Sequence, residues 1–191
     1  DIILGPDSYR RLPDLLKRSE GHPQSLVDTK LSRFEVYDDL FPSRNEGINA
    51  WISIMRGCDK FCTFCIVPFT RGRERSRNTL SILEEAKEAV KQGYKEITLL
   101  GQNVNSYHYE DYQFHHLLEA VAGVPGIQRI RYTSPHPQDI TEELLSTMSK
   151  HKNICNYIHL PLQAGSDKIL KRMNRTYTKS HFLSLVERIR D

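Results

Sequence analysis

The chain has 191 residues, 38% of them hydrophobic, with four cysteines and a formal net charge of +3. This length can bury one sizeable core, and four clustered cysteines are too few for a disulfide scaffold. No stretch approaches the ~20 apolar residues that span a membrane, and no signal peptide is recognisable, so we expect a cytoplasmic protein with no membrane partner. The first residue is not Met, and the last directly follows a helical pattern, so we also expect a fragment of a longer protein.

The amino-terminal region is irregular. Residues 2–4 predict a short strand, and apolar residues at helical spacing after a Gly-Pro-Asp turn predict a short helix. Two prolines then interrupt a weak pattern, which predicts a linker with one strand. We therefore expect an amino-terminal tail at residues 1–20, a linker at residues 21–48 and a main domain at residues 49–191.

The main domain opens with a predicted strand at residues 51–55 that leads straight into three closely spaced cysteines. Cys58, Cys62 and Cys65 have the spacing Cys-x3-Cys-x2-Cys, with Phe64 directly before the last one. Three thiolates this close together suit a 4Fe-4S cluster that keeps one iron open to a ligand. A structural zinc site instead closes its shell with four ligands, commonly as pairs. The motif therefore favours an iron–sulfur cluster with a chemical role.

Zinc remains the alternative if a fourth ligand exists. Cys155 is predicted to enter a later strand, which places it at the opposite end of the sheet, and a lone buried cysteine is usually a small core residue. Three histidines could also serve, although none has motif spacing to the cysteines: His108, His115 and His116. A zinc-bearing module is therefore the less favoured interpretation.

Positive charge gathers around the cysteines. Residues 56–77 hold six basic side chains against two acidic ones, a balance of +4, so the rest of the chain carries −1. A focused basic field predicts an anionic partner such as a nucleic acid. The alternative is an ordinary solvated surface, which the charge count by itself favours.

Strand and helix patterns alternate to the end of the chain. A helix at residues 81–92 is predicted to begin with a capping box of Ser81 and Glu84 and to end at Gly93. Further strands are predicted at residues 97–100, 130–133 and 157–160, and further helices around Phe114–Val121, around Leu144–Met148, after Ser166 and around Phe182–Ile189. About four strand–helix repeats predict an α/β fold with parallel strands and right-handed crossovers.

Polar residues follow the ends of these strands. Gln102–Asn105, Ser134–Pro137 and Gln163–Ser166 follow the second, third and fourth strands, as the cysteines follow the first. Parallel α/β folds place their chemistry at this edge of the sheet. We therefore expect one shared site built from four strand ends.

Together these motifs resemble a known family. The cysteine spacing after a first strand resembles that of the radical S-adenosylmethionine enzymes, and other runs are similar to their methylthiotransferase branch: residues 57–77, 100–105, 134–137, 159–166 and 173–177. The Gly-Gln-Asn-Val-Asn run at residues 101–105 is similar to the enzymes that methylthiolate isopentenyladenosine beside the tRNA anticodon. Residues 5–13 resemble the tail of the family's amino-terminal domain.

The resemblance implies a fold and a reaction. The fold would be a partial (βα) radical S-adenosylmethionine barrel. Cys58, Cys62 and Cys65 would hold a 4Fe-4S cluster whose free iron binds S-adenosylmethionine. An electron from a flavodoxin-like donor would split this cofactor into methionine and a 5′-deoxyadenosyl radical. The radical would take a hydrogen from C2 of the adenine in tRNA, and a methylthio group would be inserted there.

The resemblance also implies roles for other residues. Phe64 and Val67 would border the adenine of S-adenosylmethionine, and Gln102 and Asn103 occupy the loop that contacts its methionine amino group. Contacts to the ribose, the methionine or the substrate are implied for Ser134, Gln163 and Arg175. Acid–base or purely structural roles are open for His136 and His159, and tRNA phosphate contacts are implied for Arg71, Arg73 and Arg77.

The family has parts that this sequence does not contain. A second cluster is expected on three cysteines of the amino-terminal domain, and later barrel strands and an RNA-binding domain are also expected outside this chain. We therefore expect one cluster here and incomplete methylthiolation. Two alternatives stay open: an enzyme that acts on a ribosomal-protein aspartate, against which the loop at residues 102–105 argues, and a non-enzymatic metal-binding module.

Overall fold

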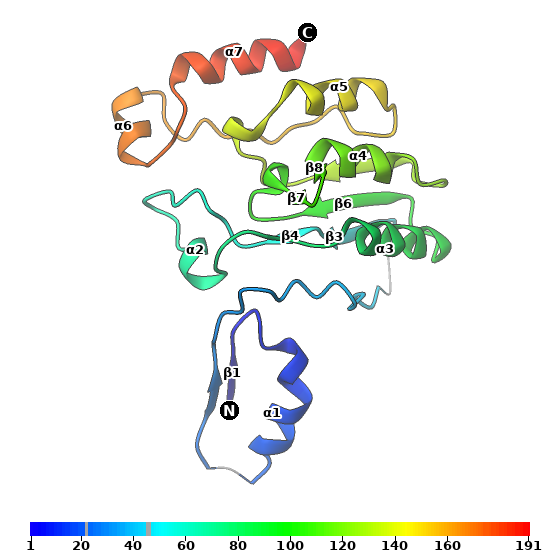
Figure 1. The fold of residues 1–191 in the computed structure, drawn as a ribbon, viewed down its shortest axis with the longest axis vertical. Helices are drawn as coiled ribbons and strands as arrows, with labels where there is room; N and C mark the ends of the chain where they lie inside the picture. The colour runs from blue at the N-terminus through cyan, green and yellow to red at the C-terminus, as the bar shows by residue number, and fades with distance from the viewer. Residues whose placement is uncertain (22, 45–46) are drawn as a thin grey trace.

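The structure is a computed structural model that describes residues 1–21, 23–44 and 47–191. A small amino-terminal unit lies beside a larger α/β body, and an extended segment connects the two (Figure 1). All four cysteines belong to the body. The functional argument therefore concerns the body and its contact with the amino-terminal unit.

The amino-terminal unit is a short βαβ arrangement. Its elements are β1 (Ile2–Leu4), a 3-10 helix (Tyr9–Arg11), α1 (Leu12–Ser19) and β2 (Leu26–Asp28). β1 and β2 pair in parallel, and the backbone N–H of Gly5 donates to the Asp28 carbonyl at 2.7 Å. The strand that was predicted for the linker is therefore β2, which pairs with β1 of the amino-terminal unit, while the division of the chain at residues 20 and 48 stays a prediction.

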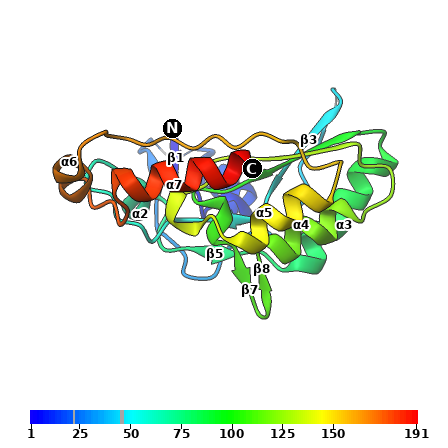
Figure 2. The same cartoon turned by 90° about the horizontal axis from the view of Figure 1, so that it is seen from above.

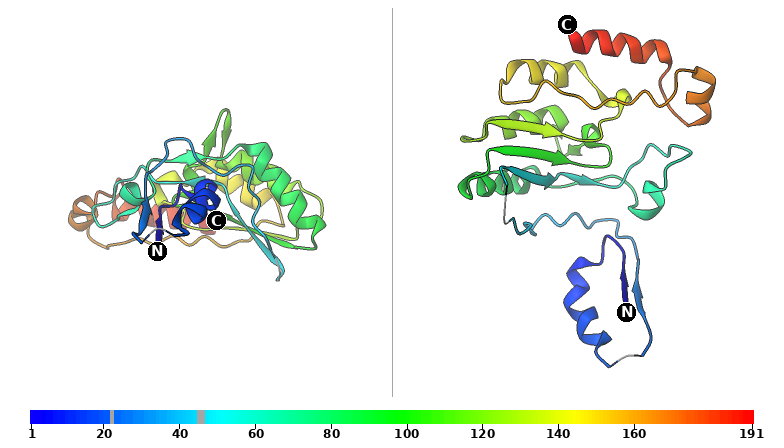
Figure 3. Two further views of the ribbon diagram at one scale, coloured as in Figure 1. Left: turned by 90° about the horizontal axis from the view of Figure 1, so that it is seen from below. Right: turned by 180° about the vertical axis from the view of Figure 1, so that it is seen from behind.

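The body is built on a parallel three-stranded sheet in the order β3–β6–β9. Figure 3 shows these strands side by side: β3 (Asn49–Ser53), β6 (Glu96–Leu100) and β9 (Arg129–Tyr132). Three helices cover one face of the sheet (Figure 2): α3 (Thr79–Lys91), α4 (Phe114–Ala122) and α5 (Glu142–Lys150). The predicted α/β fold with parallel strands is confirmed.

The core lies between the sheet and the helices. Successive strand residues point to opposite faces, and in β3 this places Ala50 and Ile52 at 0% exposure while Trp51 is 54% exposed. Ile82 and Ala86 of α3 pack in the same buried cluster. Burial of this apolar face holds the strands in register, so their carboxyl ends stay aligned at one edge.

The predicted strand at residues 157–160 does not form in the sheet. A parallel bridge joins Ile130 to Ile154, and the backbone N–H of Cys155 donates to the Ile130 carbonyl at 3.0 Å. If this register continued, residue 156 would face Tyr132, which is the last residue of β9. Residues 157–160 lie beyond that point and have no strand to pair with, so the fourth unit begins with a bridge rather than a full strand.

Two further predictions need correction. The strand at residues 51–55 does not run straight into the cysteine loop, because β4 (Met55–Arg56) leaves the sheet and pairs antiparallel with β5 (Arg75–Ser76). α3 is capped by Asn78, whose side chain accepts from the Leu80 N–H at 2.8 Å. The Ser81 hydroxyl accepts from Arg77 at 2.8 Å instead of capping the helix.

The remaining elements surround the carboxyl edge of the sheet or close the chain. They are α2 (Val67–Thr70), a 3-10 helix (Val104–Ser106), the hairpin of β7 (His108–Tyr109) and β8 (Tyr112–Gln113), a 3-10 helix (Pro137–Asp139), α6 (Asp167–Arg172) and α7 (Lys179–Arg190). Among the described residues, no helix has the length and apolar character needed to cross a membrane.

Candidate functional site

The cysteine loop connects β4 to β5. Gly57 has φ +76°, and a Cβ there would collide with the Arg73 carbonyl, so this turn requires glycine. The N–H of Gly57 donates to the side-chain oxygen of Gln102 at 2.6 Å, and the N–H of Cys58 donates to the Gly72 carbonyl at 3.2 Å. These bonds fix the start of the loop against its own return arm and against the end of β6.

The far side of the loop is held by the segment after α6. The N–H of Thr63 donates to the Met173 carbonyl at 3.2 Å, and the side chain of Asn174 donates to the Phe61 carbonyl at 2.9 Å. Asn174 has φ +56°, a left-handed conformation that asparagine tolerates well. Residues more than a hundred positions apart in the sequence therefore enclose the three cysteines.

The three thiols line one cavity of about 240 Å³. Its other walls come from the loops after β6 and β9, from the chain after the fourth-strand bridge and from the segment after α6. Lining residues that the sequence analysis named individually are Phe64, Gln102, Asn103, Ser134, His136, His159, Gln163 and Arg175, and lining residues to which it gave no individual role are Lys60, Pro135, Pro137 and Pro161. Residues expected at the strand ends therefore line one cavity, whereas Val67 of α2 is not among the lining residues.

The cysteines are free and half-buried. Burial, which disfavours the charged thiolate, raises the pKa of the Cys58 thiol above its usual range. In the described part of the chain, no three His, Cys, Asp or Glu side chains are gathered closely enough to hold a metal ion. What the loop presents is a set of three soft sulfur donors on one cavity wall, which is the donor chemistry of an iron–sulfur cluster.

Two buried polar atoms at the cavity lack a hydrogen-bond partner within the described chain: Oδ1 of Asn103 and Nε of Arg175. The Asn103 amide is oriented by its nitrogen, which donates to Asp139 at 2.8 Å. Unpaired buried polar atoms are uncommon in native structures and usually indicate a missing partner. One acceptor and one cationic donor match the ammonium and carboxylate of an amino acid moiety, so these residues fit S-adenosylmethionine as well as the thiols fit the cluster.

The cavity has a positive wall. Lys60 pairs with Asp139 at 2.8 Å, and the Arg175 guanidinium lies 5.5 Å from the centre of the Phe64 ring and 5.9 Å from that of Tyr177. In the described structure no carboxylate forms an ion pair with Arg175. Its charge is therefore available to an anionic group of a ligand.

His136 is a fixed, neutral part of this wall. Its backbone N–H donates to Oδ1 of Asn105 at 2.8 Å, and the Asn105 nitrogen donates back to its carbonyl at 3.0 Å. Burial lowers the pKa of His136 to about 4, and the nearby charges of Arg175 and Lys60 act in the same direction. The imidazole is therefore uncharged at neutral pH, and its Nδ1 accepts from the Gln138 N–H at 3.3 Å.

The three arginines proposed for tRNA contact lie in different environments. Arg71 and Arg73 are exposed, and Arg73 forms an ion pair with Asp59 at 2.5 Å while its side chain remains 72% exposed. Arg77 is 3% exposed, and its guanidinium pairs with Glu85 at 2.7 Å. A buried guanidinium committed to a carboxylate is not presented to a phosphate, so we reassign Arg77 to the core and keep Arg71 and Arg73 as predicted contacts.

Fold and site together define a class of protein, an α/β body whose strand ends gather three cysteines around a ligand cavity. Residues 52–191 match the family model of the Radical SAM superfamily, and the chain belongs to this family. The family resemblance seen in the cysteine spacing is confirmed.

Curated relatives make the comparison more specific. The chain is 48% identical over its whole length to the tRNA-2-methylthio-N(6)-dimethylallyladenosine synthase of Amoebophilus asiaticus and covers 42% of that protein. It is 49% identical to the synthase of the same name from Bacteroides fragilis, with 100% of this chain and 43% of that protein covered. The chain therefore spans less than half the length of these relatives.

Solved structures support the fold. The radical S-adenosylmethionine methyltransferase TsrM from Kitasatospora setae is 18% identical with a TM-score of 0.53, and the match covers 73% of this chain and 28% of that one. The cobalamin-dependent S-adenosylmethionine radical enzyme OxsB is 14% identical with a TM-score of 0.56, covering 71% of this chain and 21% of that one. At these identities the likeness shows a shared α/β arrangement.

Proposed function

We propose that this chain binds a 4Fe-4S cluster and S-adenosylmethionine and provides the cofactor-cleaving part of a tRNA methylthiotransferase. The observation that carries the proposal is the single cavity shared by three thiols, the unpaired Asn103 oxygen and the unpaired Arg175 nitrogen. The first set suits a cluster, and the second suits the amino acid end of the cofactor. A structural metal site would need no such adjoining polar cavity.

Each residue has a defined task in this proposal. Cys58, Cys62 and Cys65 would hold the cluster, which when bound supplies the electron that cleaves the sulfonium of S-adenosylmethionine. Asn103 would accept a hydrogen bond from the methionine ammonium, and Arg175 would donate to its carboxylate. Phe64 is proposed to border the adenine, and Gln102 to contact the methionine amino group beside Asn103. Ser134 and Gln163 are proposed to contact the ribose, the methionine or the substrate, and Val67, which does not line the cavity, is left without a role.

We further propose that the substrate is tRNA. Relatives at 48–49% identity are named for a 2-methylthio modification of N(6)-dimethylallyladenosine in tRNA, which favours tRNA over a ribosomal-protein aspartate. The exposed Arg71 and Arg73 are proposed to contact its phosphates. We place the reaction in the cytoplasm, with a flavodoxin-like electron donor and a second cluster on a separate part of the enzyme.

Anaerobic reconstitution tests the cofactor proposal directly. The chain is incubated with iron and sulfide, and roughly four irons per chain and absorption near ~400 nm are expected. Dithionite and S-adenosylmethionine are then added, and 5′-deoxyadenosine is measured by chromatography. Cys62→Ala should lose both iron and product, whereas the matched control Cys155→Ala should keep both because Cys155 lies at the opposite end of the sheet.

Two outcomes would overturn the proposal. Tight binding of zinc without iron would make the triad part of a non-enzymatic metal-binding module. A fully loaded cluster that yields no 5′-deoxyadenosine would show that this chain does not provide the cleavage step. Retention of iron in Cys62→Ala would separately disprove the ligand assignment.

A further inference from the structure

The strands that flank the cysteine loop carry an unfavourable charge pair. Arg56 of β4 and Arg75 of β5 are directly opposite each other in the antiparallel register, so their side chains project to the same side. Like charges in this position destabilise a strand pair. Both side chains are also shielded from water, with exposures of 11% and 6%. The β4–β5 pair therefore needs a negative charge from elsewhere.

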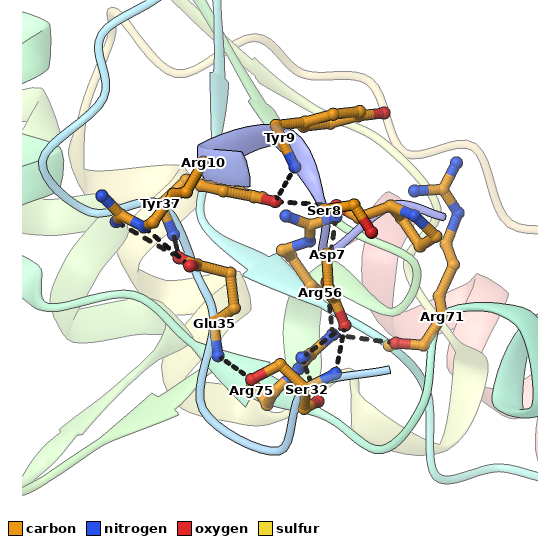
Figure 4. Close-up of polar contacts among 12 residues, drawn as sticks. Asp7, Ser8, Tyr9, Arg10, Ser32, Glu35, Tyr37, Arg56, Arg71 and Arg75 are labelled. Carbon is orange, nitrogen blue, oxygen red and sulfur yellow. Dashed lines mark hydrogen bonds and ion pairs between the residues drawn. The ribbon is translucent and has the colours of Figure 1, made fainter. Parts of the chain in front are cut away.

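Asp7 of the amino-terminal unit supplies this charge (Figure 4). Its side chain is 0% exposed, and its carboxylate pairs with Nη1 of Arg75 at 3.1 Å and with Nη2 of Arg56 at 3.4 Å. The N–H of Ser32 donates to the same carboxylate at 2.8 Å. Within the described chain, every partner of this buried carboxylate is a guanidinium or a backbone N–H, so its negative charge is neutralised inside the fold.

Further contacts tie both arginines to the same place. Nη2 of Arg56 donates to the Pro6 carbonyl at 2.7 Å, and its guanidinium lies 4.7 Å from the centre of the Tyr37 ring. Nη2 of Arg75 donates to the Arg71 carbonyl at 2.9 Å, within the return arm of the cysteine loop. The turn at residues 5–7 thus reaches both arms of the loop (Figure 4).

We propose that Asp7 is a positioning residue for the cysteine loop. By neutralising Arg56 and Arg75, it keeps β4 and β5 paired, and this pairing holds Cys58 two residues further along the chain. The amino-terminal unit is in this way coupled to the cluster site without contributing a ligand. The inference rests on the proposed function in assigning a cluster to the loop, but the position of the thiols can be tested without a cluster.

The test is the reactivity of each thiol in the metal-free chain of 191 residues. Iodoacetamide labelling is followed over time by peptide mass spectrometry, with Cys155 as the internal reference. Asp7→Asn keeps the shape of the side chain but leaves the guanidiniums of Arg56 and Arg75 without a countercharge. The loop should then open locally, and labelling of Cys58 should become about tenfold faster relative to Cys155. The double variant with Arg75→Gln removes the like-charge pair and should restore the original rate.

A matched control removes a carboxylate from the same unit. Asp28 pairs with Arg11 at 2.9 Å and is 12% exposed, but neither residue pairs with β4 or β5 in the described structure. Asp28→Asn should therefore leave the ratio of Cys58 to Cys155 labelling unchanged. An equal effect of Asp28→Asn would attribute the change to the whole amino-terminal unit and would overturn the assignment to Asp7.

Other results would also disprove the inference. An unchanged Cys58 rate in Asp7→Asn would show that the carboxylate does not hold the loop. Equal acceleration of Cys58 and Cys155 would indicate general unfolding, and failure of Arg75→Gln to restore the rate would disprove the charge argument. If the labelling results hold but the original chain neither binds iron nor yields 5′-deoxyadenosine, the proposed function fails and the positioning role of Asp7 stands.

Discussion

Buried or half-buried arginines occur in two regions of this protein, and the two groups differ in their partners. Next to the amino-terminal unit and α3, Arg75 pairs with Asp7 and Arg77 pairs with Glu85, which also pairs with Arg44. At the cavity, Arg175 forms no ion pair within the described chain. Its Nε lacks a hydrogen-bond partner, but so do the Nε atoms of Arg75 and Arg77, so the absence of a carboxylate partner is what distinguishes Arg175. The first group uses its charge for folding, and the second keeps its charge for a ligand.

The difference changes the meaning of the basic stretch at residues 56–77. Its formal charge of +4 predicted an anionic partner, yet three of its arginines are directed into Asp7 or Glu85. Arg71 and Arg73 are the exposed arginines that remain. A charge count along the sequence therefore overstates the field that a nucleic acid would meet, and the position of each guanidinium decides its role.

Removing the carboxylate of Glu85 is the most direct way to disrupt the ion pairs of the first region. Its side chain is 1% exposed and pairs with both Arg77 and Arg44, which are 3% and 8% exposed. Glu85→Gln leaves two buried guanidiniums without a countercharge and should lower the free energy of unfolding by about 3–5 kcal/mol. Urea denaturation of the metal-free chain, followed by circular dichroism, measures this loss.

The neighbouring residue on α3 provides the control. Glu84 is exposed, and Glu84→Gln makes the same chemical change with an expected effect within about 0.5 kcal/mol. Equal midpoints for Glu85→Gln and Glu84→Gln would mean that the buried pairs contribute nothing specific to stability. The region around Glu85 would then not differ from an ordinary charged surface.

The ion pairs of the buried arginines could not be predicted from the sequence, whereas the position of the strand-end residues could. Alternating strands and helices placed Cys58, Gln102 and Ser134 at one sheet edge, and the cavity confirms this because parallel strands end together. The pairing of Arg75 with Asp7 joins residues 68 positions apart, and no local pattern encodes such a contact. The predicted strand at residues 157–160 failed for a related reason, because its partner β9 ends at Tyr132.

His136 makes the positive character of the cavity measurable. Its pKa is lowered from 6.5 to about 4, first by burial and then by Arg175 and Lys60. Between pH 6.5 and pH 4 the unfolded chain binds a proton at His136 that the folded chain excludes. The stability that follows from this difference is fully present above pH 6.5 and is lost as the pH falls towards 4. Over this pH range the free energy of unfolding of the original chain should fall by on the order of 3 kcal/mol more than that of His136→Gln.

Urea unfolding of the metal-free chain across this pH range gives the difference, and an NMR titration of the imidazole gives the pKa directly. His181→Gln makes the same substitution at an exposed position and serves as the matched control. Arg175→Gln should raise the pKa of His136 because it removes a nearby positive charge. An imidazole that titrates near 6.5 would show that the cavity neither buries nor repels the charged ring.

Single phosphate contacts should give the smallest effects and the sharpest distinction within the basic stretch. Arg71→Ala and Arg73→Ala should each weaken binding of a tRNA anticodon stem-loop and reduce the salt slope of the binding constant by about 1. Fluorescence anisotropy over a range of salt concentrations measures both. Lys87→Ala removes an equal charge from the exposed side of α3 and should leave the slope unchanged. If Lys87→Ala lowers the slope as much as Arg71→Ala does, binding depends on total charge rather than on the arginines beside the cysteine loop.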